Sequence, residues 1–154
     1  SLGDMGIGEC AGEVVSCIDF DLAGAEREVF EAQIALEGGH IQQAGQFAYQ
    51  AMLRAARGLV RLEFADISAD PEQIIEEFRV RFYDTQKFFD PFAGGKFAQY
   101  LFAAHQKAQE PYTDDSARYR IDEAHLFVEA AHSCYQRIST PVPAPSVAGK
   151  GTAA

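Results

Sequence analysis

The sequence contains no tryptophan and only three cysteines among its 154 residues. Cys10, Cys17 and Cys134 are too few and too scattered for the disulfide framework of a small secreted domain. Cys10 and Cys17 also lack the close pairing of zinc and iron–sulfur ligands, so we expect these two thiols to be inert. No signal peptide and no long apolar run is present, which argues against a membrane protein and favours a cytoplasmic one.

Basic residues are also scarce, because 13 Lys and Arg stand against 23 Asp and Glu and give a formal net charge of −10. Such a chain repels phosphate backbones, which disfavours nucleic acid as a partner. A hydrophobic content of 47% excludes a disordered chain, and this length suits one domain with its own core. The chain begins at Ser1 without a methionine, which predicts a piece of a longer polypeptide or a tag remnant.

Two helical patterns meet at the pair Gly38-Gly39 and are predicted over about 22–36 and 40–63. Asp19 or Asp21 is the expected N-cap of the first helix. Two adjacent glycines can end a helix in the left-handed conformation, so the second helix should return antiparallel to the first. Its alanine-rich stripe lets a neighbouring backbone come close and predicts the centre of a bundle. Apolar residues at steps of three and four carry both predictions: Leu22, Ala25, Val29, Ala32 and Leu36, then Ile41, Ala44, Ala48, Ala51, Met52, Ala55, Leu59 and Leu62.

Three arginines of the second helix, Arg54, Arg57 and Arg61, share one stripe at steps of three and four. Such a row could grip phosphate. A solvated face balanced by Glu63 and by the acidic first helix is the favoured interpretation.

A third helix is predicted to start at Asp70-Pro71, with Asp70 as cap and Pro71 at the first helical position. The residues 90–95, Asp-Pro-Phe-Ala-Gly-Gly, break this helix, and the pattern resumes at Lys96. Its expected apolar stripe is Ile74, Ile75, Phe78, Phe82 and Phe89, then Phe97, Leu101, Ala104 and Ala108. More phenylalanines occur here than one stripe can bury, at positions 78, 82, 88, 89, 92, 97 and 102. Packing within the joint is favoured, and an exposed remainder would indicate a partner surface.

The last helix is predicted from the capped start at Thr113 to about Ile138. Its inward residues are expected to be Ile121, Ala124, Val128, Ala131, Tyr135 and Ile138. The sequence therefore predicts an all-α fold, an antiparallel up-down four-helix bundle over 21–138 whose third helix is broken near 90–96. Residues 1–20 are expected to be irregular, and residues 139–154, rich in Pro, Gly and Ala, are expected to form a disordered tail.

No cofactor is predicted, and one metal-binding pattern occurs on the last helix. Glu129-x-x-His132, with His125 on the same edge, matches half of a di-iron bundle site. The other Glu-x-x-His, formed by Glu37 and His40, spans the glycine turn, so its side chains need not share a helix face. Hydrogen-bonded histidines at the edge of the core are favoured over a metal site.

One segment near the N-terminus resembles a known enzyme family. It reads Gly6-Ile7-Gly8-Glu9-Cys10-Ala11-Gly12-Glu13, and it looks like the segment that ends the catalytic part of some bacterial nitrite and sulfite reductases of the sirohaem and iron–sulfur type. A small helical domain can follow that part. The cysteines and basic residues that hold the cluster and the sirohaem have no counterpart in this chain. The resemblance implies an appendage whose redox chemistry lies in another module.

The helical pattern over 21–138, with its closing segment Ala124-His125-Leu126-Phe127-Val128-Glu129-Ala130-Ala131, resembles the HEPN superfamily (higher eukaryotes and prokaryotes nucleotide-binding). Many members are ribonucleases with an arginine and a histidine four to six residues apart. Arg120 and His125 fit that spacing, which implies phosphate stabilisation by the arginine and proton transfer by the histidine. Other members act only in binding or assembly.

Two hypotheses of different class follow from these resemblances. The first is a noncatalytic docking domain that binds a protein partner or its parent reductase module. The second is a ribonuclease or nucleotide-binding protein that uses Arg120 and His125 across a homodimer interface. The nuclease hypothesis requires both side chains to be exposed to solvent in one cleft.

Overall fold

The computed structural model describes residues 14–140. The predicted irregular residues 1–13 and the predicted tail residues 141–154 lie outside this range. Within it the chain is all-helical and has no β-strand. None of the helices in the described range is long and apolar enough to cross a membrane. The elements are, in order, α2 (Val14–Glu37), α3 (Ile41–Val60), α4 (Pro71–Phe78), the π-helical turn η1 (Arg79–Tyr83), α5 (Lys96–Gln106) and α6 (Asp114–Ser139).

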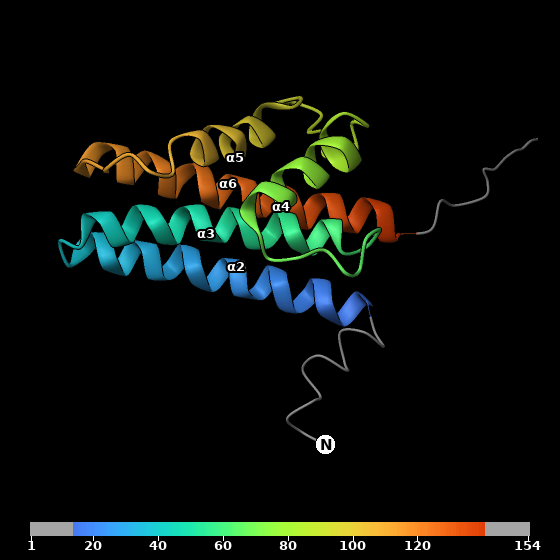
Figure 1. Cartoon of the computed structure of the whole chain (residues 1–154), viewed down its shortest axis with the longest axis horizontal. Helices are drawn as coiled ribbons and strands as arrows, with labels where there is room; N and C mark the ends of the chain where they lie inside the picture. Colours follow the sequence, from blue (N-terminus) through green and yellow to red (C-terminus); the bar gives the residue numbers. More distant parts are fainter. Residues whose placement is uncertain (1–13, 141–154) are drawn as a thin grey trace, which may run out of the picture.

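The three long helices α2, α3 and α6 pack against one another, and the short helices lie on α3 and α6 (Figure 1). Helix α3 contacts every other α-helix, which confirms its predicted central place. Its alanines 44, 48, 51, 55 and 56 have no exposed surface, and Gly45 and Gly58 are buried as well. Small side chains at these positions let the neighbouring helices approach closely.

The turn between α2 and α3 has the predicted geometry. Gly39 has a φ of +82°, the left-handed conformation that costs glycine no steric energy. The amides of Gly38 and His40 donate to carbonyls of the last turn of α2, Ile34 and Ala35, at 3.0 and 2.8 Å. These bonds satisfy carbonyls that have no partner inside the helix.

The start of α2 differs from the prediction, because the helix begins at Val14 and not near Leu22. Ile18 continues the buried stripe of Leu22 one turn earlier, so packing extends the helix upstream. Asp19 and Asp21 therefore lie inside the helix and do not cap it. Asp21 is buried, and it accepts a hydrogen bond from Arg61 at 3.0 Å.

Two of the three arginines pair with acidic residues of α2, as predicted, but Glu63 pairs with Arg81 and Lys87 instead of this row. Arg54 pairs with Glu28 at 3.1 Å, and Arg61 pairs with Asp21. Arg57 donates to the carbonyl of Ile67 at 3.1 Å. The row is partly buried, and it belongs to the contact between α2 and α3 rather than to a solvated face.

The predicted cap of the third helix is confirmed, because Asp70 accepts from the amide of Gln73 at 3.1 Å and Pro71 opens α4. The helix ends earlier than expected, because its backbone hydrogen bonding changes to the π-helical pattern of η1 and stops at Tyr83. Phe89 therefore leaves the apolar stripe and is 44% exposed. Figure 1 shows α5 leading back over α6 from the following loop. The predicted four-helix bundle with a broken third helix is thus not confirmed.

Most of the phenylalanines pack together, as favoured from the sequence. Phe78 has no exposed surface, and its ring lies 5.1 to 6.2 Å from four others, Phe82, Phe88, Phe102 and Phe127. This aromatic cluster fills the space between α4, α5 and α6. Phe89 and Phe92 are the exceptions and remain exposed.

Helix α6 starts and ends close to the predicted residues. The Thr113 hydroxyl accepts from the amide of Ser116 at 3.0 Å, and the Ser116 hydroxyl accepts from the amide of Thr113 at 2.8 Å, which completes a capping box. The predicted inward stripe is buried from Ile121 to Ala131, but Ile138 is 45% exposed. Ser139, which was predicted to lie in the tail, still belongs to the helix.

Candidate functional site

The predicted nuclease pair does not open into one cleft. Arg120 is 11% exposed and donates to Glu123 at 2.8 Å, whereas His125 is 60% exposed and pairs with Glu129 at 3.1 Å. Five residues on a regular helix turn a side chain by about 140°, so the two groups diverge around α6. The arrangement separates the predicted acid–base group from the predicted phosphate-binding group.

The predicted metal ligands are also divided. His125 pairs with Glu129 on its own helix, but His132 lies 2.5 Å from Glu26 of α2. That last contact has the distance of an ion pair without hydrogen-bond geometry, because His132 Nε2 finds no hydrogen-bond partner in the described part of the chain. No three His, Cys, Asp or Glu residues within the described range come together in a way that could hold a metal ion.

A different chain of polar groups joins three helices. Glu72 of α4 lies 2.9 Å from His105 Nε2, and the Tyr49 hydroxyl lies 2.7 Å from His105 Nδ1. A carboxylate can only accept, so Nε2 carries the hydrogen and Nδ1 accepts from the hydroxyl in the neutral ring. Burial is the main reason that the pKa of Tyr49 is raised to about 12, and the negative charge of Glu72 adds to it. The hydroxyl therefore stays protonated, and at 8% exposure Tyr49 serves packing rather than catalysis.

The two described cysteines, Cys17 and Cys134, are buried and form no disulfide. Burial raises the pKa of the Cys134 thiol to about 11, and the thiol donates to the carbonyl of Lys87 at 3.3 Å. Cys10 lies outside the described residues.

The distinctive surface feature is the loop of residues 84–95, which joins η1 to α5. At its tip Phe92 is 99% exposed. The loop is closed by two backbone hydrogen bonds between Asp90 and Gly94, at 2.7 and 3.0 Å, and Gly94 has a φ of +61°. The Asp90 carboxylate also accepts from the amides of Phe92 and Ala93, at 2.9 and 3.2 Å. An apolar ring is thus held in water on an ordered backbone.

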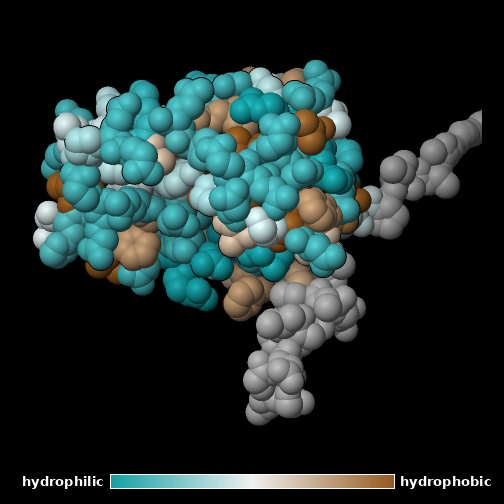
Figure 2. All heavy atoms as spheres, viewed as in Figure 1, coloured by the Kyte–Doolittle hydropathy of each residue, from teal (hydrophilic) through white to brown (hydrophobic). Residues whose placement is uncertain are grey.

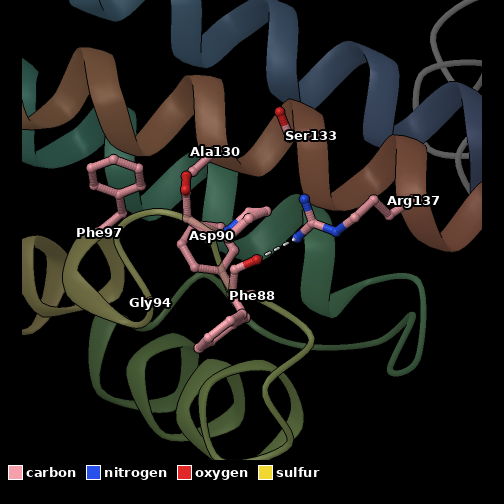
Figure 3. Close-up of a pocket in the computed structure, with 9 residues that line it drawn as sticks. Phe88, Asp90, Gly94, Phe97, Ala130, Ser133 and Arg137 are labelled. Atoms are coloured by element: carbon pink, nitrogen blue, oxygen red, sulfur yellow. Dashed lines mark hydrogen bonds between the residues drawn. The ribbon is translucent and has the colours of Figure 1, made fainter.

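Arg137 of helix α6 holds the backbone of this loop. Arg137 donates to the carbonyls of Lys87 and Phe89, both at 3.2 Å, and Figure 3 shows its side chain reaching from α6 toward the loop backbone. A hollow of about 90 Å³ lies between them, lined in part by Phe88, Phe97 and Ala130. It is large enough for a small aliphatic group of a partner.

The loop lies at one end of the bundle, together with the start of α2 and the ends of α3 and α6 (Figure 1). Ion pairs fix this arrangement, because Arg61 joins α3 to Asp21 and Lys87 joins the loop to Glu63 at 2.5 Å. Four large apolar side chains at this end, which we call the apolar end, are exposed: Phe20, Phe89, Phe92 and Ile138. Figure 2 shows a mostly hydrophilic face with scattered apolar patches, several of them toward this end and others at the opposite end.

The excess of phenylalanines in the sequence was the signal for this surface, but it could not tell which rings remain exposed to solvent.

Comparison with models of known protein families and with curated proteins finds no match for this chain. The function must therefore be argued from the residues and their geometry.

Proposed function

We propose that this chain is a noncatalytic docking domain that binds a nitrite or sulfite reductase module of the sirohaem and iron–sulfur type in the cytoplasm. The partner class rests on the resemblance of residues 6–13 to the segment that ends such a catalytic part. In the same proposal the bundle is HEPN-like, and α4, η1 and α5 take the place of its third helix.

The exposed ring of Phe92 is the observation that carries the docking proposal. Burying a phenylalanine side chain stabilises a complex by about 1.5–3 kcal/mol relative to leaving it in water. The hydrogen bonds of the 84–95 loop are already made in the free domain, so little conformational entropy is lost on binding. A rigid exposed aromatic residue has the properties of an interface hot spot.

The position of the apolar end supports the same proposal. Helix α2 begins at this end with Val14, shortly after the segment that resembles the end of a reductase catalytic part. A module attached through that segment would therefore be joined to the domain at the apolar end. Redox chemistry would remain in that module, while this domain supports its assembly or positioning.

Calorimetric titration with a purified reductase module from the same genome tests this proposal. We expect Phe92→Ser to weaken binding about 30-fold, the effect of losing about 2 kcal/mol at a hot spot. Tyr119→Ser is the matched control, because Tyr119 is 69% exposed and lies near the start of α6, away from the apolar end. Absence of binding by the unmodified domain, or equal binding by Phe92→Ser, would refute the proposal.

A ribonuclease or nucleotide-binding function through Arg120 and His125, as a homodimer, is the second candidate, supported only by their spacing in the sequence. It would require Arg120 to leave Glu123 and reach the face that presents His125. An RNA-cleavage assay with His125→Ala as the control decides this candidate. Cleavage that is lost with His125→Ala would establish it, and cleavage independent of His125 would end it.

A further inference from the structure

A second concave surface lies between α2 and α6 and shares no residue with the apolar end. Its volume is about 330 Å³, and seven residues line it: Glu26, Val29, Phe30, Gln33, His125, Val128 and Glu129. Pockets that bind ligands commonly start at about 300 Å³. The groove is therefore large enough for one or two side chains of a partner.

The floor and one wall of the groove are apolar. Val29 and Val128 form the floor and are almost fully buried, at 6% and 3% exposure. Phe30 forms the wall, and 59% of its surface is open to solvent. A ring with this exposure can accept an alkyl chain or a cation on its face.

Both sides of the groove carry a carboxylate. Glu26 on α2 and Glu129 on α6 have side chains that are 58% and 64% exposed. Each uses one oxygen toward a histidine, His132 and His125 respectively. The seven lining residues include no lysine and no arginine, and His125 is their one basic side chain, so the second oxygen of each carboxylate has no lysine or arginine of the lining beside it.

We propose that this groove binds a basic amphipathic helix of a partner protein, by taking up an arginine or lysine side chain together with an adjacent aliphatic one. The long alkyl stem packs on Val29 and Phe30, while the charged head lies between Glu26 and Glu129. Arginine and lysine bury their stems in this manner and keep the charge in water. Grooves with an apolar floor commonly bind an amphipathic helix of a partner protein.

The charge of the whole chain favours the same kind of partner. Its formal net charge of −10 attracts a basic segment and raises the rate of encounter. This inference goes beyond the docking of the reductase module, because it assigns a second partner to a separate surface. Failure of either binding test leaves the other one standing.

Fluorescence anisotropy with a labelled, alanine-based helical peptide tests the proposal. The peptide carries arginine and leucine on one face at spacings of four residues, and the control peptide carries glutamate in place of arginine. We expect the double variant Glu26→Gln, Glu129→Gln to weaken binding of the arginine peptide about tenfold. Phe30→Ala is expected to weaken it by a similar factor through loss of the wall.

A matched double variant separates local from overall charge. Glu76→Gln with Glu110→Gln removes the same two charges at exposed positions outside the groove, and should change the affinity by less than about twofold. Equal affinity for both peptides, or equal loss with both double variants, would overturn the proposal. Competition by free arginine at the peptide's own concentration would also overturn it, because the groove would then bind a small molecule and not a helix.

Discussion

The two sides of α3 are packed by opposite means. Toward α2 the surface of α3 includes small residues such as Gly58, where an added Cβ would lie 2.9 Å from Asp21, and ion pairs line the contact. Toward α4, α5 and α6 the space is filled by the aromatic cluster around Phe78. The aromatic side leaves Phe89 and Phe92 in solvent, and Phe20 and Phe30 of α2 are exposed as well. Surplus aromatic residues beside a well-filled core thus mark the surface that we assign to docking.

The largest expected effect is on the aromatic side. Phe78→Ala removes a side chain with no exposed surface and should lower the free energy of unfolding by about 3–5 kcal/mol. Urea denaturation monitored by circular dichroism measures this loss. A loss below about 1 kcal/mol would mean that the cluster repacks and is not the core of this side.

A small residue of α3 should resist enlargement where a neighbouring ring lies close. A Cβ atom added at Gly45 would lie 2.4 Å from the ring of Tyr112, whose backbone is held by two hydrogen bonds to Gln42, at 2.7 and 2.8 Å. Gly45→Ala should therefore lower the free energy of unfolding by about 1–3 kcal/mol, despite the better helix propensity of alanine.

Gly24→Ala is the control for that variant within α2. The atoms nearest to the new methyl group belong to the flexible side chain of Arg54, 2.8 Å away at Cδ, which can move aside. Its effect should stay within about 1 kcal/mol of zero. Equal losses for the two variants in thermal unfolding would show that glycine conformation, and not the close approach, decides the cost.

A smaller effect is expected from alkaline pH. The pKa of Tyr49 in the folded chain is raised to about 12 from an ordinary value of 10.0, so the folded state keeps a proton that the unfolded state loses. The stabilisation is complete below pH 10 and declines as the pH rises toward 12, by roughly 1 kcal/mol per pH unit.

Tyr49→Phe removes the hydroxyl and with it this dependence of stability on pH. We expect the free energy of unfolding of the unmodified protein to fall more steeply than that of Tyr49→Phe between pH 10 and 12, as measured by denaturant titration at each pH. Parallel curves would contradict the buried, protonated state of the hydroxyl.

The smallest expected effect on stability belongs to Phe92→Ser. The ring is 99% exposed, so the free energy of unfolding should change by less than about 0.5 kcal/mol. Compared with Phe78→Ala, this variant separates a ring that holds the fold from a ring that serves a partner. A loss above about 1 kcal/mol would show that Phe92 packs within its own domain.

Helix boundaries set by local chemistry could be predicted from the sequence. The glycine turn, the Asp70 cap and the Thr113 cap depend on residues within one helical turn of the boundary, and all three are confirmed. The start of α2 was missed because it depends on the packing of Ile18 against other helices, which periodicity around the glycine-rich N-terminus does not reveal. The third helix ends early because it passes into η1, which ends at Tyr83, and this removes Phe89 from the predicted apolar stripe.

The candidate sites were less predictable, because they combine distant parts of the chain. The spacing of Arg120 and His125, and with it their divergence around a helix, was visible in the sequence, but their ion pairs with Glu123 and Glu129 depend on side-chain direction. The groove joins Glu26 to Glu129, residues from two helices far apart in the sequence. The surplus of phenylalanines indicated a partner surface without identifying Phe92 as its exposed member.

Hydrogen–deuterium exchange of this domain, alone and with the reductase module, tests the docking proposal most directly. We predict slower exchange of the amides of residues 88–95 in the complex and unchanged exchange in residues 114–125 of α6. Unchanged exchange in 88–95, or protection centred on 114–125, would contradict docking through the loop that carries Phe92.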